Sequence, residues 1–189
     1  MYNNVHSYFA GQEVFIAADL LWYPVQGDPR TVVAPDVMLA FGRPDGDRAS
    51  YLQWLEDNVA PQVVFEVLSP SNTPMEMLSK QAFYFAHGVE ELIVIDPGKK
   101  EGDPESFFPC LRQGEEMVAS PFAPVEWTSP RLGFRFRVED GKLQIFFPDG
   151  SAFRSFTEIM RGLDIETERA NRAEAELEAM RARLRDLEG

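Results

Sequence analysis

Apolar, β-branched runs alternate with turn residues along most of the chain, and this pattern predicts a succession of short strands. The runs occupy residues 13–24, 31–42, 61–70, 89–98, 106–120 and 130–150. The run at 61–70, PQVVFEVLSP, is the most apolar and has a proline at each end. Within the last run, Asp140-Gly141 is typical of a two-residue hairpin turn.

A helix is expected between two of these strands. Residues 69–88 read as a turn followed by a helix that begins near Pro74 and stops at Gly88. A strand, a helix and a second strand in this order predict a right-handed crossover between parallel strands. Together with the shorter strands and their turns, this predicts an α/β fold with a central mixed sheet.

The pattern changes near Phe156, where a proline-free sequence rich in Ala, Glu, Arg and Leu predicts a long helix to residue 189. Its apolar residues follow a seven-residue repeat in two rows: Leu163, Ala170, Leu177 and Leu184, then Ala173, Met180 and Leu187. Such a seam either self-associates as a coiled coil or packs onto its own domain. We therefore divide the chain into a domain over 1–155 and a C-terminal heptad helix over 156–189, and we expect a homodimer if the seam pairs.

Composition narrows the function classes. No apolar run reaches the roughly 20 residues of a membrane span, and the N-terminus does not resemble a signal peptide, so a cytoplasmic protein without membrane contact is expected. With Cys110 as the single cysteine and two histidines, a disulfide is excluded and a His/Cys zinc site nearly so. A formal net charge of −13 argues against a general nucleic-acid binder.

Two carboxylates interrupt apolar strands. Glu66 lies inside VVFEV, and Asp36 lies directly after a proline in VVAPDVMLA. A buried carboxylate needs an ion pair, a strand end open to water, or a hard cation such as Mg²⁺. If the two strands are neighbours, Asp36 and Glu66 converge, and their repulsion favours a shared cation or a raised pKa.

Lys80 lies on the predicted helix 14 positions after Glu66, and its direction is open. Met75, Leu78, Ala82 and Phe85 form the obvious apolar stripe at helical spacing, which puts Lys80 on the solvent side. Met77 and Tyr84 share the side of Lys80, however, so that side is not purely polar, and a lysine can reach around a helix.

The segments APDVMLAFG, VVFEVLSPSN and Lys80…Tyr84…HGVEELIVIDP, in this order and spacing, resemble the Uma-two family of restriction endonucleases, a branch of the PD-(D/E)xK nuclease superfamily. The resemblance runs from about Val14 to Asp149. It implies a restriction-endonuclease-like core, with a central mixed sheet flanked by helices. It also implies more N-terminal structure than this chain has, so the nuclease domain is expected to be N-terminally short.

The resemblance assigns roles to individual residues. It implies Asp36 and Glu66 as ligands of Mg²⁺ or Mn²⁺, with the Val67 carbonyl as a further ligand. The lysine usual two positions after the second acid is absent, because Leu68 stands there. The resemblance places that lysine on the following helix as Lys80, with Tyr84 one turn on.

The function expected is therefore a Mg²⁺-dependent DNA endonuclease, in which Asp36, Glu66 and Lys80 are catalytic and a metal-activated water attacks the phosphodiester. The main alternative is a non-catalytic interaction protein on a nuclease fold, which self-associates through the C-terminal helix. A metal-dependent enzyme acting on small nucleotides would suit the acidic charge, but no Gly-rich phosphate loop supports it.

Overall fold

The computed structural model describes residues 1–98, 100, 102–154 and 172, and residues 1 to 153 form one compact unit. Its elements, in chain order, are α1 (Tyr2–Tyr8), β1 (Val14–Ala17), β2 (Trp22–Tyr23), β3 (Val37–Phe41), β4 (Tyr51–Leu52), the 3₁₀ turn η1 (Gln53–Leu55), β5 (Val63–Val67), α2 (Pro74–Ala86), β6 (Glu91–Asp96), β7 (Ser106–Gln113), β8 (Glu116–Ala119), β9 (Glu126–Thr128), β10 (Arg135–Glu139) and β11 (Lys142–Phe146). The long helix predicted over 156–189 lies outside the described residues, apart from Arg172, so the coiled coil and the homodimer stay predictions.

A six-stranded sheet forms the centre, in the order β1-β3-β5-β6-β7-β8. β5 and β6 are parallel and joined through α2, whereas the other neighbouring pairs are antiparallel. The predicted α/β fold with a central mixed sheet and a parallel crossover is thus confirmed. A small sheet, β11-β10-β9, and the pair β2-β4 complete the strands in the part of the chain that the structure describes.

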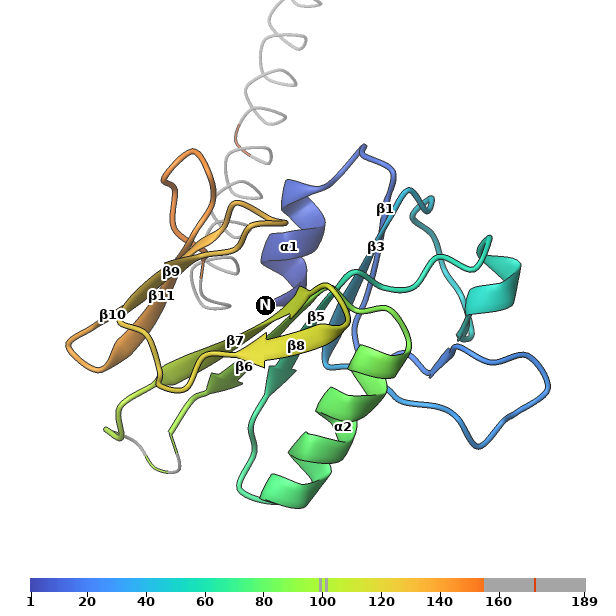
Figure 1. Cartoon of the computed structure of the whole chain (residues 1–189). Coiled ribbons are helices and arrows are strands. Elements are labelled where there is room, and N and C mark those ends of the chain that lie inside the picture. Colours follow the sequence, from blue (N-terminus) through green and yellow to red (C-terminus); the bar gives the residue numbers. More distant parts are fainter. Residues whose placement is uncertain (99, 101, 155–171, 173–189) are drawn as a thin grey trace, which may run out of the picture. The chain divides into compact units, whose positions relative to one another are not determined.

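The central sheet has a core on each face. One contains alternate residues such as Leu39, Phe65 and Ile93 and packs against α1 and the β9–β11 sheet. The other contains the intervening residues, such as Met38 and Val64, and includes Tyr84 of α2. Figure 1 shows α2 on one side of the sheet and α1 on the other. Because strand side chains alternate between faces, every second residue of β3 and β5 lies on the face that carries α2.

Local sequence explains where α2 begins and ends. The Thr73 hydroxyl accepts a hydrogen bond from the Glu76 N–H, and the Glu76 carboxylate accepts one from the Thr73 N–H, which makes a capping box with Pro74 in the first turn. At the other end Gly88 has φ +107°, and a Cβ there would lie 2.9 Å from the Ala60 Cβ. Glycine therefore ends the helix where the chain turns into β6.

The predicted hairpin at Asp140-Gly141 joins β10 to β11, and both residues have positive φ, +50° and +73°. This is the backbone of a type I′ turn, which matches the twist of the strands. None of the described helices is both long and apolar enough to cross a membrane.

Candidate metal centre

Strand register brings the two predicted carboxylates together. β3 and β5 are antiparallel, with Val37 opposite Phe65 and Met38 opposite Val64. One further step along this ladder places Asp36, the residue before β3, beside Glu66 of β5. Both side chains therefore belong to the α2 face of the sheet, because they alternate with Val37 and Phe65 on the other face. The convergence expected from sequence is present.

Asp36 is tied to the end of β5. Its Oδ2 accepts a hydrogen bond from the Val67 N–H at 2.6 Å. Val67 is the last residue of β5 and is 38% exposed, whereas the four residues before it in the strand are buried. The two carboxylates thus lie where the strand leaves the core and approaches water.

Glu66 is only 2% exposed and receives both its hydrogen bonds from α2. Lys80 Nζ donates to Oε2 at 2.6 Å, and the Tyr84 hydroxyl donates to Oε1. Lys80 and Tyr84 are one helical turn apart, so they reach the same carboxylate from one side of the helix. The ammonium remains partly open to water, with 28% of its side chain exposed.

Burial dominates the electrostatics of this group. Loss of water raises the pKa of Glu66, and Asp36 raises it further, while the hydrogen bonds from Lys80 and Tyr84 and the lysine charge lower it. Burial and the neighbouring Glu66 charge raise the pKa of Tyr84, so its hydroxyl stays a donor. Two carboxyl groups thus share one lysine, and a cation bound between them would favour their ionised forms.

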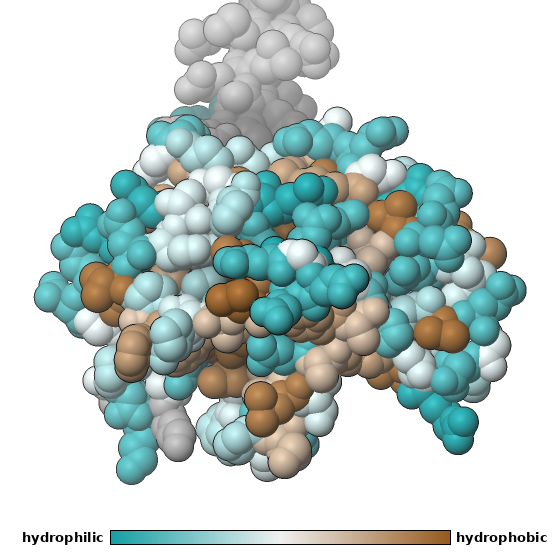
Figure 2. Space-filling view, viewed as in Figure 1, coloured by the Kyte–Doolittle hydropathy of each residue, from teal (hydrophilic) through white to brown (hydrophobic). Residues whose placement is uncertain are grey.

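The side of α2 that faces the sheet is not the apolar stripe expected from the sequence. Met75 and Leu78 of that stripe are 71% and 59% exposed, while Tyr84 is fully buried and Lys80 points to Glu66. Brown and tan surface appears in Figure 2 where Figure 1 places α2. The reading of Met75 and Leu78 as core is therefore wrong, and the side of Lys80 is the one that meets the sheet. The sequence feature that indicated this orientation was Met77 and Tyr84, which lie on the same side of the helix as Lys80.

The residues present fit a small divalent cation. Mg²⁺ takes oxygen ligands, usually one or two protein carboxylates, and keeps waters for its other positions. Asp36 and Glu66 supply two carboxylates side by side, and the Val67 carbonyl lies at the exposed end of the same strand. Among the described residues no three His, Cys, Asp or Glu side chains gather as a larger metal cluster. The donor set thus suits an ion that retains much of its water.

Leu68 stands in the position of the usual lysine, two residues after Glu66. Its N–H donates to the Ile95 carbonyl at 2.8 Å, which continues the β5–β6 ladder, and its side chain lines a cavity beside α2. The cation that neutralises Glu66 comes from the helix instead.

Other acidic residues near these elements have local structural roles. Asp19 adopts φ +52° in the turn after β1, and its N–H donates to the Pro35 carbonyl. Asp96 accepts a hydrogen bond from the Gly98 N–H at 2.9 Å and closes the turn after β6. Glu76 completes the capping box of α2. None of these contacts links them to Asp36 or Glu66.

Comparison with known proteins gives one family. Residues 2–105 match the model of the Uma2 family, described as "Putative restriction endonuclease". No curated protein matches the sequence. Among solved structures, a nuclease described as putative and belonging to DUF820, from Anabaena variabilis ATCC 29413, is similar, with 18% sequence identity and a TM-score of 0.47. The alignment covers 68% of this chain and 66% of that structure.

Proposed function

Because the chain belongs to the Uma2 family, we propose that it is a Mg²⁺-dependent endonuclease that hydrolyses phosphodiester bonds in DNA. Family membership supports nuclease activity in general. The choice of metal, the residues that hold it and DNA as the substrate are our proposals, and they rest on the chemistry of the site.

One observation carries the proposal. The β3–β5 register sets Asp36 beside Glu66 on one face, and α2 directs Lys80 onto the same carboxylate. Two acids can hold a metal ion, and a lysine can stabilise the charge that develops on a phosphate, so the three groups together suit metal-dependent phosphodiester hydrolysis. A purely structural ion pair would need only Glu66 and Lys80, and the one hydrogen bond that Asp36 accepts, from the Val67 N–H, does not require Asp36 to lie beside a buried glutamate.

Each residue has a distinct task in this proposal. Asp36, Glu66 and the Val67 carbonyl would hold the ion, and a bound Mg²⁺ supplies Lewis-acid polarisation of the phosphate and lowers the pKa of a water. The Val67 N–H fixes Asp36, and the Tyr84 hydroxyl fixes Glu66. Lys80, partly exposed and held at Glu66, is placed to orient the attacking water or to donate to a phosphate oxygen as negative charge develops.

The test combines metal binding with cleavage. Mn²⁺ titration by calorimetry and nicking of supercoiled plasmid are measured for the wild type, Asp36→Asn and Lys80→Met, with Glu116→Gln on the exposed strand β8 as the matched control. We expect Asp36→Asn to lose both metal binding and cleavage. Lys80→Met should retain metal binding and lose cleavage, while the control behaves as the wild type. An active Asp36→Asn, Glu66→Gln double variant would contradict the proposal.

A non-catalytic interaction protein is the second candidate, and a specific contact favours it. Both oxygens of Glu66 already accept hydrogen bonds, from Lys80 and Tyr84, which is the arrangement of a satisfied structural ion pair. In that case Mn²⁺ produces no heat in the titration, and Lys80→Met only destabilises the fold.

Self-association belongs to this second candidate as well. Light scattering of the full chain and of a Leu177→Asp, Leu184→Asp variant measures it directly. A dimeric wild type and a monomeric variant are expected if the heptad seam pairs.

A further inference from the structure

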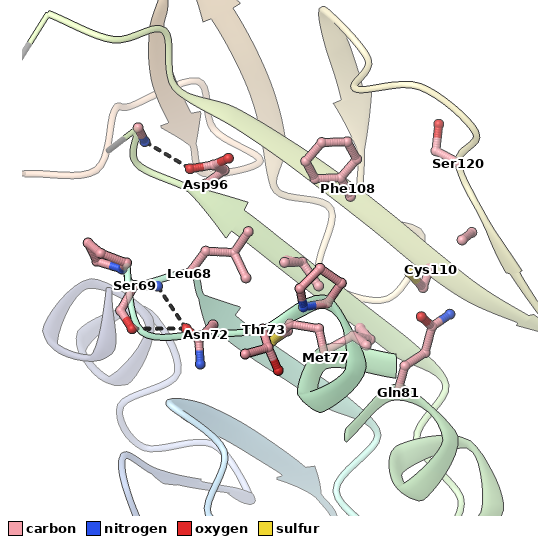
Figure 3. A pocket seen from close by; sticks show the side chains of 16 residues that line it. Leu68, Ser69, Asn72, Thr73, Met77, Gln81, Asp96, Phe108, Cys110 and Ser120 are labelled. Carbon is pink, nitrogen blue, oxygen red and sulfur yellow. Dashed lines mark hydrogen bonds between the residues drawn. The ribbon is translucent and has the colours of Figure 1, made fainter. Parts of the chain in front are cut away.

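A cavity lies beside the candidate metal centre, between α2 and the strands β6, β7 and β8. Its volume is about 440 Å³, within the range of small-molecule sites. The lining is mostly apolar, with polar groups at the margins, and includes Leu68, Met77, Val94 and Phe108 together with Gln81 and Asp96. Figure 3 shows Phe108 and Met77 on opposite sides of the cavity, with Asp96 and Gln81 at opposite margins of the view.

The floor of the cavity continues the row of strand positions that contains the carboxylates. Glu66 pairs with Val94 across β5–β6, and Val94 pairs with Phe108 across β6–β7. Asp36 extends the same row on the other side of Glu66. With a strand spacing of about 4.8 Å, Phe108 lies roughly 10 Å from Glu66 along the sheet, on the same face.

The walls of the cavity also belong to elements that build the metal centre. Leu68 follows Val67, whose N–H holds Asp36, and Met77 precedes Lys80 by one turn on the same side of α2. A ligand in the cavity and a group bound at Glu66 would therefore contact the same strand end and the same helix.

The chemistry of the lining favours a flat, uncharged ligand. Among the lining residues there is one charged side chain, Asp96, and no lysine or arginine, so a phosphate is disfavoured there. Phe108 is half-buried and makes no contact with another aromatic ring in the part of the chain that the structure describes, which leaves a ring face for stacking. Gln81 makes no hydrogen bond to any described residue, so its amide is available at the margin.

The cations of the described unit offer little to a phosphate backbone. Most of them are already paired with carboxylates: Arg30 with Asp28, Arg43 with Asp57, Arg48 with Glu56, Arg131 with Glu90, Arg137 with Glu126 and Glu139, and Lys142 with Glu105. Counterion release at these residues of the described unit would therefore contribute less than it does in most DNA-binding proteins. Contacts with the bases would then supply a larger share of any affinity that this unit has for nucleic acid.

We propose that this cavity receives one nucleobase of the substrate, unstacked from its neighbours, next to the phosphodiester held at Asp36 and Glu66. The base stacks on Phe108, and its amino edge donates to Asp96 or meets the Gln81 amide. A base inside a duplex stack cannot enter a cavity that a helix covers on one side, so the base comes from a single strand or is extruded. This inference rests on the proposed function, which it extends by a determinant of substrate recognition.

The test separates base contacts from backbone contacts. Fluorescence anisotropy without divalent metal measures the binding of a single-stranded decamer and of a fully abasic decamer with the same phosphates. We expect the wild type to bind the base-bearing decamer about tenfold or more tightly than the abasic one, since one stacked base contributes that order of affinity. Phe108→Ala should lose this preference. Phe122→Ala, which removes an 80% exposed phenylalanine outside the cavity, should retain it.

A second variant guards against a folding defect in Phe108→Ala. Ala119 is exposed on β8 and lines the cavity, so Ala119→Phe fills it without removing a core side chain. The preference should disappear in this variant as well. Equal binding of both decamers by the wild type, or a preference that survives Phe108→Ala and Ala119→Phe, would overturn the inference.

Cleavage of the same base-bearing decamer with Mn²⁺ is measured separately. Base preference without cleavage contradicts the proposed function and leaves the cavity assignment intact. Cleavage without base preference contradicts the cavity assignment alone.

Discussion

Two glutamates are almost equally buried in neighbouring parallel strands, yet they have very different surroundings. Glu66 near the end of β5 is 2% exposed, and Glu91 at the start of β6 is 3% exposed. Burial raises the pKa of both side chains. They lie on opposite faces and towards opposite ends of the parallel pair, because Glu66 pairs with Val94 and Glu91 pairs with Val63.

The partners of Glu91 are fixed and local to one turn. It accepts hydrogen bonds from the Ser129 hydroxyl and the Arg131 N–H, each at 2.5 Å, and the Ser129 hydroxyl accepts one from the Leu132 N–H at 2.9 Å. The carboxylate thus closes the turn that precedes β10. These donors cannot leave without opening the turn, which marks a structural role.

Of the two hydrogen-bond donors to Glu66, Tyr84 is fully buried and Lys80 is partly exposed. Lys80 is a flexible, partly exposed cation, and Asp36 is a second carboxylate beside it at an open strand end. A cation entering here could replace the ammonium and release Lys80 towards substrate. A buried carboxylate therefore does not by itself indicate a site; the proposal for Glu66 rests on the second acid and on the partly exposed lysine beside it.

Matched glutamine substitutions should separate the two glutamates most strongly in activity. Glu66→Gln removes a proposed metal ligand but keeps an oxygen for the Tyr84 hydroxyl, and we expect Mn²⁺-dependent cleavage to fall about a thousandfold, roughly 4 kcal/mol of barrier. Glu91→Gln should change the rate less than about threefold. Rate constants for plasmid nicking at saturating metal check this. A rate loss in Glu91→Gln as large as that in Glu66→Gln would end the distinction.

Glu91 should matter for the free energy of unfolding, because its carboxylate closes the turn before β10. Glu91→Ala leaves the Ser129 hydroxyl and the Arg131 N–H without their acceptor, and we expect a loss of about 2 to 3 kcal/mol in unfolding free energy. Ser129→Ala removes one donor to Glu91 and the acceptor of the Leu132 N–H, but the Arg131 N–H keeps its acceptor, so it should cost less, about 1 to 2 kcal/mol. Urea titrations of both variants provide the measurement. Equal losses in the two variants would mean that the carboxylate does not hold the turn.

Much of this architecture follows from local patterns, and the part that does not is non-local. The β5 strand, the start of α2 at Pro74 and the Asp140-Gly141 turn depend on a few adjacent residues, so periodicity and turn chemistry predict them. The sequence left the direction of Lys80 on α2 open, because a hydrophobic stripe predicts burial only when the facing surface is apolar. Here the sheet presents Glu66, and the helix turns Lys80 and Tyr84 towards it.

The cavity beside the candidate metal centre also depends on non-local contacts. Phe108 joins the row of Asp36 and Glu66 only through the registers of three strand pairs, which no local pattern encodes. The adjacency of the two acids was accessible in advance because each acid interrupts an apolar strand. Phe108 gave no comparable signal, since a phenylalanine in a strand is ordinary.

Mn²⁺ should stabilise the folded protein through Glu66 and not through Glu91. If Mn²⁺ binds only the folded site, a free concentration about thirty times Kd adds about 2 kcal/mol to the unfolding free energy. We expect this gain in the wild type and in Glu91→Gln, and we expect it to vanish in Glu66→Gln. Urea denaturation with Mn²⁺ and with a chelator measures the difference. The same gain in all three proteins would place the ion elsewhere.

The smallest expected effect is the contribution of Glu91 to the pH dependence of the unfolding free energy. Burial, and then the charge of Glu90, raise the pKa of Glu91 against the hydrogen bonds that lower it, so the folded state keeps this proton to a higher pH than the unfolded state. Between the unfolded pKa of about 4.3 and the higher folded pKa, the folded state binds more protons, and stability falls as pH rises. Glu91→Gln removes this contribution, so the wild type should lose stability relative to the variant through that interval, by less than about 1.4 kcal/mol per pH unit. Urea titrations of both proteins from pH 4 to 7, roughly the window of acid titration, measure this. The other carboxylates affect both proteins equally, so their contributions cancel in the difference between the two unfolding free energies. A difference that stays constant with pH would show that the turn holds Glu91 without favouring its protonated form.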